Sequence, residues 1–133
     1  QAAYKRGNVK LTPKILKNSQ EYVQNKCNTG HNPVDFVFHG GSGSTLEEIR
    51  EAISYGVIKM NIDTDLQFAF TEGIRDYMTS KIDYLRTQIG SPDGADSPNK
   101  KHYDPRKWVR EGEVTFNKRL EQAFADLNNV NTL

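Results

Sequence analysis

Apolar residues along this chain follow two different spacings, and each spacing predicts a different kind of element. After Thr12-Pro13, apolar residues recur at helical spacing, which predicts a helix that begins there and ends before Gly30. Residues 34–39 and 57–62 are two short apolar, β-rich runs. Such continuous runs are typical of parallel strands that are buried on both faces.

The stretch between these two runs predicts a helical crossover. Ser44 and Glu47 have the spacing of a capping box, and Leu46, Ile49 and Ile53 follow as an inward-facing apolar stripe. Gly56 is placed to end this helix. Residues 40–56, seventeen in all, are enough for a right-handed connection between two parallel strands.

The second half of the chain is predicted to be mainly helical. A long helix is expected from about Asp65 to about Gln88, followed by a loop over residues 89–104 and a last helix from Asp104-Pro105. The order is thus α-β-α-β-α-loop-α. Two strands alone leave both sheet edges unpaired, so the chain is either a very small α/β unit or, as we favour, a piece of a larger sheet.

Composition narrows the classes of function. The 133 residues carry a net charge of +1 without a basic stripe, which argues against nucleic-acid binding. No apolar run reaches the roughly 18 residues of a membrane span, and residues 1–11 lack the apolar centre of a secretory signal. Cys27 is the single cysteine, which suits a reducing compartment and a cytoplasmic location.

Polar residues with possible chemistry follow both predicted strands. Residues 40–44, GGSGS, precede a helix and could cradle a phosphate, although a tight turn would need the same small residues. His39 ends the first strand, where a structural role and a ligand or acid–base role are equally plausible. In the second cluster, Asp63 or Thr64 could simply cap a helix, whereas Asn61 is better placed to donate to a substrate oxygen.

The motifs FHGGSGST, YGVIKMNIDTD and PNKKHYDPRKW together resemble class II fructose-bisphosphate aldolases, from about Tyr4 to Leu133. The long tail with YDPR is similar to the dimeric branch of that family, found in fungi and many bacteria. The resemblance implies an α/β fold that is the C-terminal part of a (β/α)₈ TIM barrel, with its last two strands and C-terminal helices. Residues 1–88 would belong to the barrel, and residues 89–133 would form the C-terminal loop and helices.

The resemblance also implies roles for individual residues. His39 matches a zinc ligand, and Asn61 matches the residue that steadies the enediolate. Arg106 matches an arginine that reaches the neighbouring subunit's site in a homodimer and meets the second phosphate of the sugar. The positions that match the binding site for dihydroxyacetone phosphate are Gly40, Ser42, Asn61, Asp63 and Thr64. The family implies Zn²⁺ as cofactor and leaves a monovalent cation open.

The implied activity is that of a lyase: zinc-dependent, reversible cleavage of fructose 1,6-bisphosphate to dihydroxyacetone phosphate and glyceraldehyde 3-phosphate. The front of the chain departs from the family, because Gln1 stands at a zinc-ligand position and Ala2 at a phosphate-binding glycine. Further ligands and the proton donor are also missing, so the isolated chain is expected to be inactive. The alternatives are a non-catalytic phosphate-binding or interaction module, or a tagatose-bisphosphate aldolase.

Overall fold

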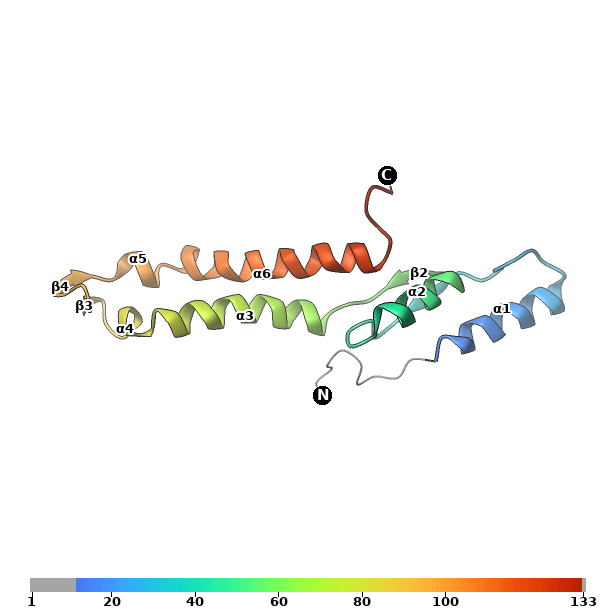
Figure 1. The fold of residues 1–133 in the computed structure, drawn as a ribbon, viewed down its shortest axis with the longest axis horizontal. Coiled ribbons are helices and arrows are strands. Elements are labelled where there is room, and N and C mark those ends of the chain that lie inside the picture. The colour runs from blue at the N-terminus through green and yellow to red at the C-terminus, as the bar shows by residue number, and fades with distance from the viewer. Residues whose placement is uncertain (1–11, 133) are drawn as a thin grey trace. The chain divides into compact units, whose positions relative to one another are not determined.

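The computed structural model describes residues 12–132 (Figure 1). These residues divide into two compact units. Unit 1 contains residues 12–65 and 122–132, and unit 2 contains residues 66–121. The elements of the first half are α1 (Lys14–Cys27), β1 (Phe36–Phe38), α2 (Leu46–Ser54) and β2 (Val57–Met60). Those of the second half are α3 (Thr64–Ser80), α4 (Ile82–Leu85), β3 (Ile89–Ser91), β4 (Gly94–Pro98), α5 (Lys100–Tyr103) and α6 (Pro105–Asp126).

The parallel β1–α2–β2 unit that the apolar pattern predicts is present in unit 1. Phe36 pairs with Val57, and Phe38 pairs with Met60. The capping box of α2, however, lies one residue later than predicted. Thr45, not Ser44, takes the extended N-cap conformation: its hydroxyl accepts the Glu48 N–H at 3.2 Å, and the Glu48 carboxylate accepts the Thr45 N–H at 2.9 Å. Both pairs match the capping pattern, but the Ser44 N–H is used in the preceding turn, where it bonds to the Gly41 carbonyl.

The prediction that both strands are buried on both faces is wrong for this chain. Val37 in β1 is 50% exposed, and Ile58 in β2 is 69% exposed. The cause is the size of the sheet, since β1 and β2 pair only with each other among the described residues. An open hollow of about 190 Å³ lies beside β2, lined by Ile53, Val57, Ile58, Lys59, Met60, Leu127 and Asn129.

Gln20 of α1 holds the base of the β1–α2–β2 unit together. Its side chain is buried, and its Nε2 donates to the carbonyls of Val34 at 2.6 Å and Tyr55 at 2.8 Å. Its Oε1 accepts the Val34 N–H at 2.9 Å. Gly56 lies directly against this amide at φ +95°, where a Cβ would stand 2.5 Å from Nε2, so the position requires glycine for both reasons.

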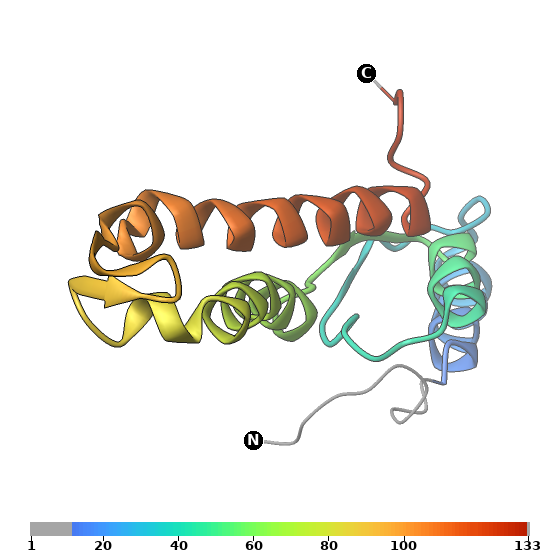
Figure 2. The same ribbon diagram turned by 60° about the vertical axis from the view of Figure 1, so that its left-hand side comes forward.

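In unit 2, α3 and α6 run side by side in opposite directions (Figures 1 and 2). Their backbones come unusually close at two glycines. A Cβ on Gly73 would collide with the Glu111 carbonyl, and one on Gly112 would press on the side chains of Phe70 and Ile74. The long helix predicted to reach Gln88 is wrong in extent, because α3 ends at Ser80 and a separate short helix, α4, follows from Ile82. At this break the Tyr77 carbonyl accepts both the Lys81 N–H at 3.0 Å and the Ser80 hydroxyl at 2.9 Å.

The predicted loop over residues 89–104 contains regular structure. β3 and β4 form an antiparallel hairpin, and α5 follows it directly. Asn99 explains this compactness: it is almost fully buried, and its Nδ2 donates to the carbonyls of Thr87 and Gly90 at 2.9 Å each. The proline and glycine content of this stretch favours irregular backbone, but a buried amide replaces the missing apolar core here. No described helix is both long and apolar enough to cross a membrane.

We predict that Gln20→Leu destabilises the chain by about 2–4 kcal/mol, because it leaves two carbonyls and one N–H of the half-buried Val34 and Tyr55 without the partners that the buried amide supplies. Urea unfolding followed by circular dichroism measures the change. Gln24→Leu is the matched control, since it makes the same exchange at a partly exposed position of α1, and it should change the unfolding free energy by less than about 0.5 kcal/mol. Equal stability of the two variants would contradict the role given to Gln20.

Candidate functional site

The carboxyl ends of β1 and β2 bring the two predicted polar clusters of unit 1 together. The Asn61 N–H donates to the Phe38 carbonyl at 2.9 Å, and the Gly41 N–H donates to the Asn61 carbonyl at 3.1 Å. The strand pairing thus continues past β1 into the glycine-rich loop. Gly40 has φ +86° and open space around it, so the loop turns where only glycine is comfortable and leaves room beside the backbone.

His39 and Asn61 are in direct contact across the strand ends. The Nδ1 atom of His39 lies 2.8 Å from the Asn61 amide nitrogen, and the His39 side chain is exposed. Two arrangements satisfy this contact: the ring nitrogen accepts from the amide, or the amide is turned and its oxygen accepts from a protonated Nδ1. The second arrangement leaves Nε2 unprotonated and directed away from Asn61, which is the form that binds a metal ion.

Ser42 connects the loop to the start of α3. Its side chain is buried, and its hydroxyl accepts the Asp65 N–H at 3.5 Å. Asp63 and Thr64, the two other predicted residues of this cluster, are exposed at the same helix start. The structure therefore brings His39, Ser42 and Asn61 into one region with the N-terminus of α3, where the positive end of the helix dipole favours an anion.

The sequence pattern predicted that the Ser44 side chain caps α2, but in the structure Thr45 takes this role and the Ser44 hydroxyl is not used in the cap. It is 2% exposed, and its hydroxyl has no hydrogen-bond partner within the described part of the chain. A buried hydroxyl without a partner costs free energy, which a bound ligand would recover. The only sequence signal for it is its position at the end of the glycine-rich loop.

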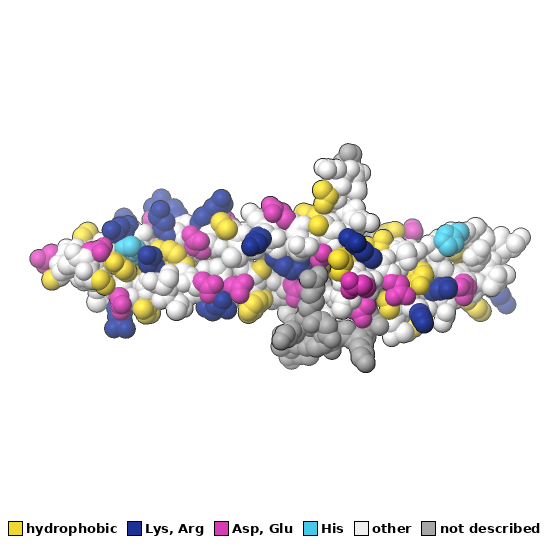
Figure 3. Space-filling model, viewed as in Figure 1, with side chains coloured by type: hydrophobic (Ala, Val, Ile, Leu, Met, Phe, Trp, Pro, Cys, Tyr) yellow, Lys and Arg dark blue, Asp and Glu magenta, His cyan; other side chains and the backbone are white. Residues whose placement is uncertain are grey.

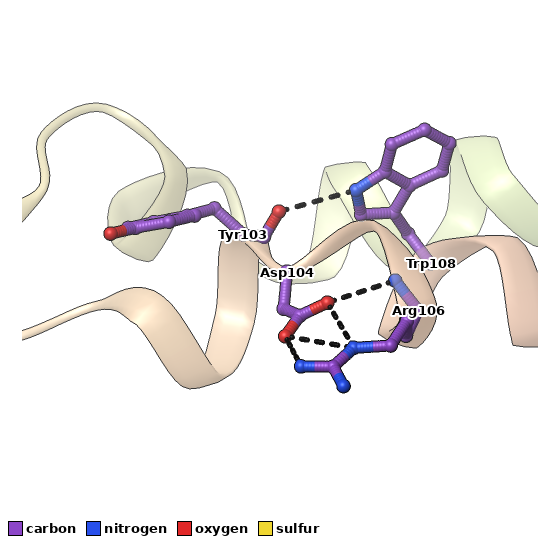
Figure 4. A network of polar contacts seen from close by, with 4 residues as sticks. All are labelled: Tyr103, Asp104, Arg106 and Trp108. Carbon is purple, nitrogen blue, oxygen red and sulfur yellow. Dashed lines mark hydrogen bonds and ion pairs between the residues drawn. The ribbon is translucent and has the colours of Figure 1, made fainter.

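Arg106 lies in unit 2, at the start of α6, and is 86% exposed. The Asp104 carboxylate, only 17% exposed, forms an ion pair with this guanidinium (Figure 4). The Arg106 Nε donates to both Asp104 oxygens at 3.0 and 3.2 Å, its Nη2 donates to Oδ2, and its backbone N–H donates to Oδ1 at 3.1 Å. The side-chain hydrogen bonds from Arg106, followed by the backbone one, lower the pKa of the Asp104 carboxyl from 3.8 to about 2.

The described residues do not complete a metal site. No group of three or more His, Cys, Asp or Glu side chains within residues 12–132 could hold an ion. His39 offers one nitrogen, whereas a zinc site uses at least three protein ligands. The departures from the family at Gln1 and Ala2 lie outside the described residues.

We predict that the Asp104 carboxyl titrates near pH 2 and that Arg106→Ala returns its pKa toward 3.8. Because the folded pKa is depressed, the charged pair stabilises the fold above about pH 4, and this contribution is lost as the pH falls toward 2. Carbon-13 NMR of the side-chain carboxyl measures the titration. Arg110→Ala is the control, because that arginine pairs with Glu113 instead. An Asp104 pKa that stays the same in Arg106→Ala would contradict the effect assigned to Arg106.

Comparison with known proteins identifies the family that this chain resembles. The family Fructose-bisphosphate aldolase class-II matches residues 1–132. Curated aldolases from Edwardsiella ictaluri and Aspergillus oryzae are 59% and 57% identical over 98% of this chain, and "Fructose-bisphosphate aldolase class 2" of Escherichia coli is 56% identical over 98%. The chain spans 36% of the length of each.

The crystal structure of the Campylobacter jejuni fructose-bisphosphate aldolase is also similar in fold. It matches with a TM-score of 0.88 at 56% identity, over 96% of this chain and 38% of that one. The α/β fold is accordingly that of the C-terminal part of an aldolase TIM barrel, as the motifs predicted. The chain belongs to the class II fructose-bisphosphate aldolase family.

Proposed function

We propose that this chain forms the phosphate-binding and enolate-stabilising part of a class II fructose-bisphosphate aldolase. The observation that carries the proposal is the convergence of His39, Asn61 and the residue 40–44 loop at the carboxyl ends of two parallel strands. In TIM-barrel enzymes, this end of the strands is where catalytic residues gather. The reaction is the reversible cleavage of fructose 1,6-bisphosphate.

The loop would bind the phosphate of dihydroxyacetone phosphate. It combines an open backbone at Gly40, the N-terminus of α3 next to Ser42, and the unpartnered hydroxyl of Ser44. These groups are donors, and a phosphate dianion supplies acceptors only. Asp63 and Thr64 at the start of α3 would complete this pocket, with Thr64 as a further hydroxyl donor.

Asn61 is the residue that we assign to the reacting atoms. Its amide is held beside His39, and its backbone is fixed by hydrogen bonds to both Phe38 and Gly41. A donor that is oriented before the reaction stabilises developing negative charge on a substrate oxygen without reorganising. Contact with the imidazole restricts the amide to one region of the strand ends, which is the preorganisation this role needs.

The remaining parts of the enzyme would come from outside the described residues. Zinc, the expected cofactor, would need ligands in addition to His39, and the proton donor is not among the candidate residues of this chain. Arg106 would serve the second phosphate in the site of a partner subunit of a homodimer. The enzyme would act in the cytoplasm.

We predict that residues 12–132 of this chain, placed in the Escherichia coli relative in place of the stretch that they match, yield an active aldolase. The 56% identity makes the core of the two proteins compatible, and the relative supplies the missing ligands. Cleavage of fructose 1,6-bisphosphate is measured by a coupled assay. In this chimera, Asn61→Ala should lower kcat by about 10²–10³.

The chimera also carries matched controls. His39→Ala should abolish most of the activity, whereas His31→Ala, which removes an exposed loop histidine, should leave kcat and KM within about twofold of the parent. A folded chimera without activity, or equal activity of the two histidine variants, would rule out the proposed function.

We further predict that the 133-residue chain alone binds Zn²⁺ no more tightly than millimolar in calorimetry, because one imidazole is an incomplete ligand set. The active chimera, assayed in parallel, should bind Zn²⁺ at least about 10³-fold more tightly. Tight stoichiometric binding by the isolated chain would contradict the assignment of the other ligands to the rest of the enzyme.

A further inference from the structure

We propose that Asp104 is a positioning residue: it holds the Arg106 guanidinium so that the edge formed by Nη1 and Nη2 stays free to bind a phosphate. The proposal rests on the proposed function, in which Arg106 meets the second phosphate of the substrate. Asp104 itself would not touch the substrate, because its oxygens are used by Arg106.

The hydrogen bonds leave a defined set of donors on Arg106. A guanidinium carries five N–H groups, and Asp104 engages those of Nε and one of Nη2. The Nη1 atom lies on the side of the guanidinium away from the carboxylate (Figure 4), so the planar group keeps both Nη1 donors and the second Nη2 donor free of Asp104. Two parallel donors on one edge are the arrangement that binds phosphate in a bidentate manner.

Without Asp104, little else would fix this side chain. Arg106 is 86% exposed, and all its side-chain hydrogen bonds that the structure describes go to Asp104. Lys and Arg side chains gather around this part of unit 2 in Figure 3, and several of them are neutralised locally: Lys101 pairs with Asp93, and Arg110 pairs with Glu113. Arg106 is distinct because its partner also holds its backbone.

The backbone on both sides of Asp104 is held in place by contacts with neighbouring helices. The Tyr77 hydroxyl donates to the His102 carbonyl at 2.8 Å, and the rings of Tyr84 and His102 are in tilted contact with their centroids 4.2 Å apart. On the other side, the Trp108 indole donates to the Tyr103 carbonyl at 3.4 Å (Figure 4). The turn that carries Asp104 is therefore tied to α3 and α4 before it and to α6 after it.

Holding the guanidinium has a benefit and a cost for phosphate binding. Ordering a free arginine side chain on binding costs about 0.5–1.5 kcal/mol, which corresponds to a change of about 2- to 12-fold in affinity. Because the hydrogen bonds to Asp104 already order Arg106 before the phosphate binds, binding does not carry this cost. The negative charge of Asp104 opposes the phosphate, but the carboxylate engages the neighbouring Nε–Nη2 edge of the guanidinium and not the free Nη1–Nη2 edge. The exposed guanidinium is also surrounded by solvent, which screens this repulsion. Orientation should therefore outweigh the repulsion.

Asp104 also caps α6, so the test must separate the two roles. Its Oδ1 accepts the Arg106 N–H at the first turn of the helix, and serine makes an equivalent cap. Asp104→Ser keeps the cap and is too short to engage the guanidinium in two places. Asp96→Ser is the matched control, since it removes an exposed carboxylate from β4 of the same unit.

The variants are compared in the chimera described above. We expect Asp104→Ser to lower kcat/KM for fructose 1,6-bisphosphate between about twofold and about tenfold, chiefly through KM, and Asp96→Ser to change it by less than about twofold. The effect should disappear for fructose 1-phosphate, which lacks the second phosphate. It should also disappear in an Arg106→Ala background, because the two residues act as one unit.

A second readout needs no activity. In the 133-residue chain, the Arg106 Nε–H NMR signal should exchange slowly with water in the parent and rapidly in Asp104→Ser. An Asp104→Ser chimera that matches its parent while Arg106→Ala is impaired would overturn the positioning role and leave the proposed function standing. A loss that is equal for both sugars, or that persists without Arg106, would also overturn it; a parent chimera without activity would overturn the proposed function and the positioning role with it.

Discussion

The parallel pairing of β1 with β2 is the constraint on which the candidate site depends. Its register carries hydrogen bonds past the strand ends to Gly41 and Asn61, and so places Asn61 against His39. A shift of one residue would turn Asn61 to the opposite face of the sheet. The buried amide of Gln20 supports this register from the other end of the strands, where it joins Val34 to Tyr55. Packing and chemistry are thus coupled through a few backbone hydrogen bonds.

Much of this arrangement could be predicted from the sequence, because local patterns determined it. The apolar runs located both strands, and Asp104-Pro105 located the start of α6. The capping box was displaced by one residue, since Ser44/Glu47 and Thr45/Glu48 satisfy the same pattern and only the path of the turn chooses between them. The exposure of Val37 and Ile58 could not be read from apolar character, because burial depends on neighbouring strands that the described residues do not contribute.

The least predictable features depend on contacts between residues distant in sequence or on the use of a polar group as a core. Asn99 organises the β3–β4 hairpin by filling its interior with an amide, and a turn-rich sequence gives no sign of that. The grip of Asp104 on Arg106 is local, yet the pattern Asp-Pro-x already has a sufficient explanation as a helix start. Motif recognition identified Arg106 and passed over the carboxylate that orients it. Supporting residues of this kind become visible only when donors and acceptors are counted.

The contact between α3 and α6 has a consequence for how unit 2 can move. Gly73 and Gly112 let the two helix backbones approach closely, and a sliding step of one helical turn, about 5.4 Å, would bring side chains to positions where only a hydrogen atom fits. The contacts at Gly73 and Gly112 therefore fix the position of α6 along the axis of α3. Since Arg106 lies in the first turn of α6, these glycine contacts also set where the backbone of Arg106 lies relative to α3. An adjustment of the arginine toward a ligand without a shift of α6 along α3 then comes from rotation of the side chain itself.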